Sequence, residues 1–129
     1  MLNALPLAFL PAALVTDIAY ARTAQMEWAD FSVWLIAAGA AFGVFAVLAE
    51  IAAAVSARRK GQLPASRLGG VLMVSAVVTA IVNGFIHSRD AWTSVVPTGL
   101  VLSIISTIFI VVSSWLIYSA VAPRHPGVA

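Results

Sequence analysis

Four long apolar stretches alternate with short polar ones along the chain. The apolar stretches cover about residues 2–20, 32–57, 68–87 and 98–121. A helix of about 20 apolar residues crosses a hydrocarbon core of about 30 Å, so each stretch predicts one membrane-spanning helix. The polar connections 21–31, 58–67 and 88–97 are short, which predicts that consecutive helices are antiparallel neighbours. The predicted fold class is therefore all-α: an integral membrane four-helix bundle that forms one domain over residues 1–129.

Composition excludes a soluble domain. Hydrophobic residues make up 62% of the chain and charged residues only 9%, whereas a soluble domain carries about 25% charged residues. The first apolar stretch lacks a basic segment before it and a small-x-small cleavage site after it. We therefore expect a retained helix there rather than a cleaved signal peptide.

The positive charges predict a topology rather than a nucleic-acid partner. The formal net charge is +2 with seven basic residues, and four of these, Arg58, Arg59, Lys60 and Arg67, lie in or beside the second connection. By the positive-inside rule this connection is cytoplasmic, and four crossings then place both termini in the cytoplasm. The predicted location is a multi-pass position in the cytoplasmic (inner) membrane, with membrane lipids around the bundle and no nucleic acid bound.

Small residues at a spacing of four predict close helix packing. They are Gly39 and Gly43 in the second stretch and Gly99, Ser103 and Thr107 in the fourth. Such residues let two helix backbones approach each other. The contact they form is either packing within one monomer or a face for a homo-oligomer or another subunit.

Polar residues gather at the end of the bundle away from the basic connection. An ionisable group inside a membrane segment is a candidate functional residue because its insertion costs about 2.5–3.5 kcal/mol. We expect an outer polar cluster there, made of Asp17, Tyr20, Asn83, His87, Arg89 and Asp90. Two interpretations stay open: a salt bridge between helix ends, or a site for a polar headgroup, a quinone ring or a partner protein.

Glu50 is a second intramembrane carboxylate, in the cytoplasmic part of the second stretch. A proton pathway needs a chain of such groups across the membrane, and only Asn3 and Asp17 extend this one. We interpret Glu50 as a packed residue with its own partner, or else as a contact for lipid or protein.

Little in the amino-acid sequence supports cofactor binding or enzyme activity. The chain has no cysteine, which excludes disulfides, cysteine-ligated iron–sulfur clusters and thioether-attached haem. His87 and His125 are predicted at opposite membrane surfaces, His87 at the outer one, and cannot ligate one iron within a monomer. Two His87 rings in a dimer, or Met26, leave haem b open. No metal-ligand spacing occurs, and Ser103, Ser106, Ser113 and Ser114 repeat along one helix without a base. We expect no metal, no intrinsic cofactor and no enzyme activity.

Several sequence segments resemble one bacterial membrane family. They are Leu5-Pro6-Leu7-Ala8-Phe9, Asp17-Ile18-Ala19-Tyr20, Trp34-Leu35-Ile36-Ala37-Ala38-Gly39, Asn83, His87-Ser88-Arg89-Asp90, Trp92 and Val96-Pro97-Thr98-Gly99-Leu100. Together they span most of the chain and resemble the family listed as domain of unknown function 2231. The polar segments carry most of this resemblance.

The resemblance implies a bacterial four-helix membrane domain without a settled activity. Some members are associated with redox proteins, which implies an electron-transfer or respiratory setting. Many members carry histidines before the first helix, but this chain opens with Met1-Leu2-Asn3. If those histidines bind a cofactor in other members, the resemblance implies that this chain has lost that capacity or borrows it from a partner.

Three functions are compatible with these features. The first is a non-catalytic accessory or anchoring subunit of a larger membrane complex, of a redox or energy-transducing kind. The second is a small haem- or quinone-binding electron-transfer protein that uses Asp17, His87 and Arg89. The third is a transporter or channel component with Asp17 and Glu50 on its pathway. The sequence does not identify the partner complex, a ligand or the oligomeric state.

Overall fold

The structure is a computed structural model that describes residues 2–63, 66–89 and 95–121. Its elements are α1 (Ala4–Thr23), α2 (Met26–Arg59), α3 (Arg67–His87), a short kinked turn η1 (Val95–Gly99) and α5 (Leu100–Val121). The four spans, with η1 and α5 counted as one, are long and apolar enough to cross a membrane. The predicted all-α fold of four membrane helices is confirmed.

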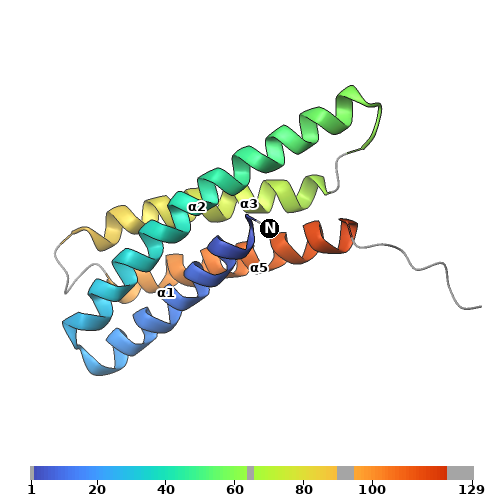
Figure 1. The fold of residues 1–129 in the computed structure, drawn as a ribbon. Coiled ribbons are helices and arrows are strands. Elements are labelled where there is room, and N and C mark those ends of the chain that lie inside the picture. Colours follow the sequence, from blue (N-terminus) through green and yellow to red (C-terminus); the bar gives the residue numbers. More distant parts are fainter. Residues whose placement is uncertain (1, 64–65, 90–94, 122–129) are drawn as a thin grey trace, which may run out of the picture.

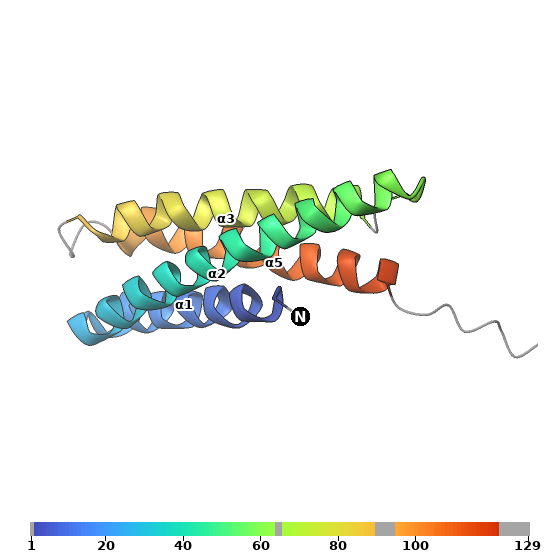
Figure 2. The ribbon, with the colours of Figure 1, turned by 45° about the horizontal axis from the view of Figure 1, so that its top comes forward.

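The helices form a closed ring of neighbours. α1 packs on α2, α2 on α3, α3 on α5, and α5 on α1. Figure 1 shows the four helices side by side, and in Figure 2 α2 crosses the bundle obliquely, from beside α1 toward α3. We call the end where α2 finishes and α3 starts the basic end, and the opposite end the Asp17 end.

The connection between α1 and α2 is shorter than predicted. α1 continues to Thr23 and α2 already begins at Met26, six residues before the predicted start at Ser32. Ala24 ends α1 because it takes a left-handed backbone (φ 54°) and its N–H bonds to the Tyr20 carbonyl. Polar residues in the first turns of α2 obscured its start, yet Glu27 there favours a helix amino end electrostatically.

The last helix begins later than predicted, at Leu100 instead of Thr98. The preceding turn η1 is interrupted at Val96, whose backbone is extended (φ −120°, ψ 127°). Val96 precedes Pro97, and the proline ring disfavours helical geometry in the residue before it. The kink places Val95 and Gly99 inside the bundle.

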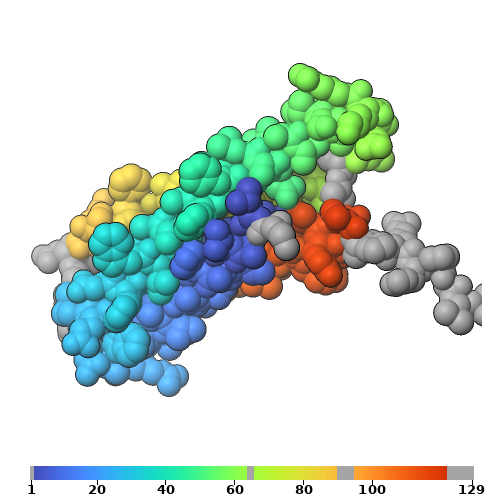
Figure 3. All heavy atoms as spheres, in the orientation of Figure 1, coloured from blue at the N-terminus to red at the C-terminus, as the bar shows by residue number. Residues whose placement is uncertain are grey.

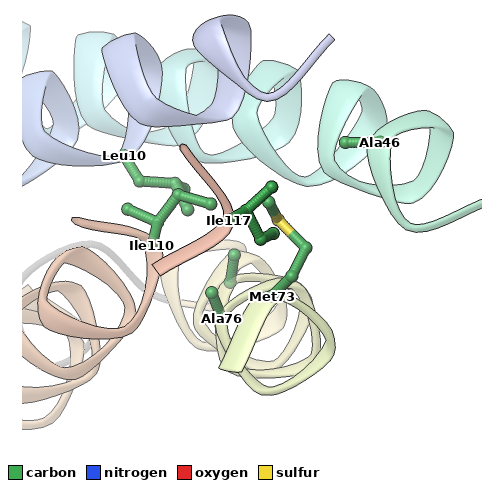
Figure 4. Close-up of a cluster of buried hydrophobic side chains, with 7 residues drawn as sticks. Leu10, Ala46, Met73, Ala76, Ile110 and Ile117 are labelled. Carbon is green, nitrogen blue, oxygen red and sulfur yellow. The ribbon is translucent and has the colours of Figure 1, made fainter. Parts of the chain in front are cut away.

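The apolar core draws on all four helices. Its buried residues are Leu10, Ala46, Met73, Ala76, Ala80, Ile110 and Ile117. Figure 4 shows the Leu10 side chain directed at Ile110, with Met73 beside Ile117. Three of these seven core residues are alanines, and small side chains allow helix backbones to lie close together in a membrane.

The two glycines of α2 pack against two different helices. A Cβ atom at Gly39 would lie 2.6 Å from Leu10 Cδ2 of α1, and one at Gly43 would lie 2.6 Å from Val77 Cγ2 of α3. Gly99 at the end of η1 and Ser103 in α5 are buried, and Thr107 of α5 donates a hydrogen bond to the Leu10 carbonyl (3.3 Å). The structure thus places these small residues in contacts within one monomer.

α2 is much longer than its neighbour α1. Its 34 residues span about 51 Å at 1.5 Å per residue. α1 begins near the level of Glu50, where Asn3 Nδ2 donates a hydrogen bond to Glu50 Oε1 (3.2 Å). The last buried side chain of α2 is Ala46, so toward Arg59 the helix continues without α1 beside it (Figure 1).

Candidate functional site

The most polar part of the interior is centred on Asp17. Its side chain is fully buried (0% exposed) and accepts hydrogen bonds from the hydroxyls of Ser32 and Ser103. His87 Nε2 lies 3.0 Å from Asp17 Oδ1. These residues come from α1, α2, α5 and α3, so the group joins every helix of the bundle. With Asn83, we call this set the Asp17 network.

Helical periodicity brings the network together. Ser32 belongs to the buried side of α2, where buried residues recur every three or four positions from Ala29 to Ala46. Ser103 begins the equivalent side of α5. Asn83 and His87 are four residues apart on α3, so they share one face of that helix. Each polar side chain therefore occupies a core-facing position in its own helix.

Both ring nitrogens of His87 have partners. Nδ1 lies 3.1 Å from the backbone carbonyl of Asn83, which can only accept, so Nδ1 carries a hydrogen and donates it. Nε2 faces the Asp17 carboxyl group. The Asp17 carboxyl group therefore has a hydrogen-bonding partner from each of α2, α3 and α5. A buried carboxyl group with such partners is far less costly in a membrane interior than an isolated one.

Ser103 connects the two parts of the network. Its hydroxyl donates to Asp17 Oδ2 and accepts from Asn83 Nδ2 at 2.7 Å. Because Asn83 is the donor to Ser103, its side-chain amide must turn the NH₂ end toward that hydroxyl, since only the NH₂ end can donate. The Asn83 Oδ1 atom points the other way and has no hydrogen-bond partner among the described residues.

Two members of the predicted outer cluster, Arg89 and Tyr20, lie outside this network. His87 is buried rather than at the surface, and it lies next to Asp17. Arg89 lies past the end of α3 and is exposed, because two further residues carry it out of the bundle. Tyr20 is buried against Ala29 and Val95, and its hydroxyl lies 4.0 Å from Met26 Sδ. Asp90 lies outside the described residues.

Sequence reasoning did not assign Ser32 or Ser103 to this site. In the sequence, Ser32 marks the start of the second apolar stretch, and Ser103 is one of the small residues that predict helix packing. The available signal was their register: each is the hydroxyl residue on the buried side of its helix at the depth of Asp17. A buried carboxyl group needs donors, and these two supply them.

Glu50 lies far from the Asp17 network. It is half-buried near the basic end and bonds to Asn3, as described above. The two carboxyl groups thus have separate hydrogen-bond partners, which agrees with the interpretation of Glu50 as a partnered residue. Within the described ranges, no three histidine, aspartate or glutamate side chains converge on a common point.

The hydrogen bonds of the network connect all four helices. We predict that Ser103→Ala lowers the free energy of unfolding by about 1 kcal/mol, because interhelical hydrogen bonds in membranes contribute about 0.6–1.7 kcal/mol each. Ser103 takes part in two such bonds. The measurement is reversible unfolding in mixed detergent micelles.

Ser106→Ala is the matched control for this substitution. Ser106 is equally buried on the same helix, but its hydroxyl bonds only to the backbone carbonyl of Ser103. Its loss is expected to change the free energy of unfolding by less than about 0.5 kcal/mol. Equal effects of the two substitutions would mean that Ser103 contributes no interhelical stabilisation.

Comparison with known proteins identifies one family. Residues 1–125 match the family described as "Predicted membrane protein (DUF2231)". No curated protein and no solved structure matches the chain. The match covers all four helices, including every member of the Asp17 network.

Proposed function

The chain belongs to the DUF2231 family of membrane proteins, and from this premise we propose that it is a non-catalytic accessory or anchoring subunit of a larger membrane complex. The feature that carries the proposal is the outward side of α2, a long helix of which the bundle buries only one side. The proposed partner is another membrane subunit that packs on this side.

Four large aromatic residues lie on the outward side of α2. We call Phe31, Trp34, Phe42 and Phe45 the aromatic face; all four are exposed, Trp34 to 76%. At 100° per residue they share one side of the helix, opposite the buried residues from Ala29 to Ala46. Figure 3 shows α2 lying uncovered along the front of the molecule. Aromatic residues are enriched where subunits meet.

Two further observations support a protein contact on this face. Phe42 is held in place by stacking on Phe9, with ring centroids 5.9 Å apart. At the Asp17 end of the face, Glu27 and Asp30 join Phe31 and Trp34 around a shallow hollow of about 260 Å³. An aromatic surface with a carboxylate rim suits a partner helix that ends in a basic side chain.

The Asp17 network supports a structural rather than a catalytic role. Its carboxyl, imidazole and hydroxyl groups are used in bonds between the four helices. Both His87 nitrogens are engaged, so haem ligation by His87 would require breaking contacts inside the bundle. For this reason we place the accessory role above a haem- or quinone-binding role.

The proposal also includes the kind of complex and the orientation of the chain in the membrane. The redox or energy-transducing character follows from the family resemblance alone. The positive charges at the basic end support a cytoplasmic position of that end under the positive-inside rule, and the proposed orientation has both termini on the same side of a bacterial cytoplasmic membrane. A cysteine-accessibility assay at the α1–α2 turn and at Gly61 would test this orientation.

The test is purification of the tagged chain from its native membrane in mild detergent, with mass spectrometry of the bound proteins. We expect a membrane subunit in stoichiometric amount. Combined replacement of Phe31, Trp34 and Phe45 by alanine is expected to remove most of it, because aromatic anchors dominate interface energies and cost about 2 kcal/mol or more each.

The control replaces equally exposed aromatic residues on other helices. Phe85 on α3 and Trp115 on α5 are exposed to 70% and 66%, and their replacement by alanine should leave the partner bound. Loss of the partner from both variants alike, or a chain that purifies alone, would contradict the aromatic face as the docking surface. A haem spectrum or a retained quinone in the lone chain would favour the electron-transfer alternative.

A further inference from the structure

A groove separates α2 from α3 at the basic end of the bundle. Its volume is about 650 Å³. The α2 wall includes Glu50, Ala54 and Ala57, and the α3 wall includes Gly70 and Val74. It lies on the side of α2 that packs into the core further along the helix, nearly opposite the aromatic face.

Small side chains keep this groove open. A Cβ atom added at Gly70 would meet nothing within 4 Å, in contrast to the crowded Gly39 and Gly43. The facing positions of α2 are alanines, and the exposed apolar residues Ile51, Val71 and Val74 continue the surface outward. The body of the groove is therefore apolar and wide enough for a hydrocarbon chain.

The mouth of the groove is positively charged. Arg58 near the end of α2 and Arg67 at the start of α3 both line it. Both are exposed, and the one contact of a basic side chain with a carboxyl group in the described part of the chain is that of His87 with Asp17. The two guanidinium groups thus have no carboxylate partner among the described residues.

Glu50 does not neutralise this mouth. It lies eight residues before Arg58, about 12 Å along the helix, and its carboxyl group already accepts a hydrogen bond from Asn3. The amino end of α3 adds positive partial charge beside Arg67. The groove is therefore cationic at its mouth and apolar along its body. This arrangement complements a phospholipid, in which an anionic phosphate headgroup is followed by an apolar acyl chain.

We propose that this groove binds one anionic phospholipid. Arg58 and Arg67 hold the phosphate by charge-assisted hydrogen bonds, and an acyl chain lies along Ala54, Gly70 and Val74. Basic pockets between membrane helices on the cytoplasmic side are suited to anionic headgroups. This site is separate from the aromatic face and does not depend on the proposed subunit role.

The test is native mass spectrometry of the full chain in detergent with added phosphatidylglycerol or phosphatidylcholine. The wild type is expected to retain one phosphatidylglycerol and to release phosphatidylcholine. The double variant Arg58→Gln with Arg67→Gln is expected to lose retention at least about tenfold, since each basic residue contributes to binding an anionic lipid. Gly70→Leu places a bulky side chain in the groove from a position where an added Cβ meets nothing within 4 Å, and it should also abolish retention.

The matched control is Arg59→Gln with Lys60→Gln, which removes two charges of the same connection that do not line the groove. It should retain phosphatidylglycerol. An equal loss in this control would mean diffuse surface attraction and overturn the site, as would equal retention of phosphatidylcholine or full retention by Gly70→Leu.

Two further outcomes identify other occupants. Displacement of the lipid by glycerol 3-phosphate would assign the mouth to a soluble phosphate ester and overturn the lipid proposal. A crosslink from a cysteine at Gly70 to another protein subunit would assign the groove to a partner helix, with the same consequence. Retention of the lipid in a chain that purifies alone would support this site while counting against the subunit role.

Discussion

Replacing Asp17 with alanine is expected to lower the free energy of unfolding by about 3 kcal/mol, because buried polar groups left without a hydrogen-bond partner cost about 1–3 kcal/mol each. The substitution leaves two serine hydroxyls and the His87 Nε2 atom without their shared acceptor. Because these groups come from three other helices, their loss weakens every interface at the Asp17 end. Unfolding in mixed detergent micelles measures the effect.

Two variants separate the network from a general effect of charge. Asp17→Asn keeps one acceptor oxygen and the shape of the side chain, so we expect roughly half of the loss. Asp30→Ala removes an exposed carboxylate and is expected to stay within about 0.5 kcal/mol of the wild type. A wild-type stability for Asp17→Ala would show that the network does not stabilise the bundle.

The second large effect is expected at the glycines of α2. Gly43→Ala places a methyl group 2.6 Å from Val77 Cγ2, and Gly39→Ala places one 2.6 Å from Leu10 Cδ2. Val77 is β-branched and stiff, and Leu10 is fully buried, so neither side chain can move aside without repacking. Overpacking of this kind costs about 1–3 kcal/mol, measured by the same unfolding experiment.

Gly70→Ala and Gly84→Ala are the matched controls in α3. An added Cβ meets nothing within 4 Å at Gly70 and only Ile36 Cγ2 at 3.6 Å at Gly84. These substitutions are expected to be neutral or stabilising by up to about 1 kcal/mol, since alanine favours the helix over glycine. Destabilisation at all four glycines would point to a general demand for glycine rather than to close helix packing.

The number and type of helices could be predicted because hydrophobic length alone decides them in a membrane. The 21 residues of α3 match the predicted stretch 68–87 to within one residue at its start. The start of α2 could not be read in the same way. Its first turns extend beyond the purely apolar part of the chain, and Glu27 and Asp30 resemble a polar loop until the backbone shows them on exposed helix positions.

Some residues of the candidate site could be predicted from the sequence, and others could not. Asp17, Asn83 and His87 could be grouped from depth and spacing, and the structure places them together. Arg89 lies beyond the end of α3 and is exposed, so of the two basic side chains in this part of the chain only His87 contacts Asp17. Ser32 and Ser103 could not be assigned to the Asp17 network from the sequence. A serine that faces the core cannot be told from one that faces lipid until the rotation of its helix about its own axis is known. Rotation is set by packing between helices, and one sequence does not reveal it.

The links of the Asp17 network also imply an order of events during synthesis. Ser32 follows Asp17 by 15 residues, whereas His87 and Ser103 follow it by 70 and 86. At about 5–20 residues per second, Ser103 leaves the ribosome some 4–17 seconds after Asp17. Until the later helices are made, the Asp17 carboxyl group in the nascent α1–α2 hairpin therefore has only the hydrogen bond from Ser32. The third helix then supplies His87 and the fourth supplies Ser103, so the network closes only when all four helices are present.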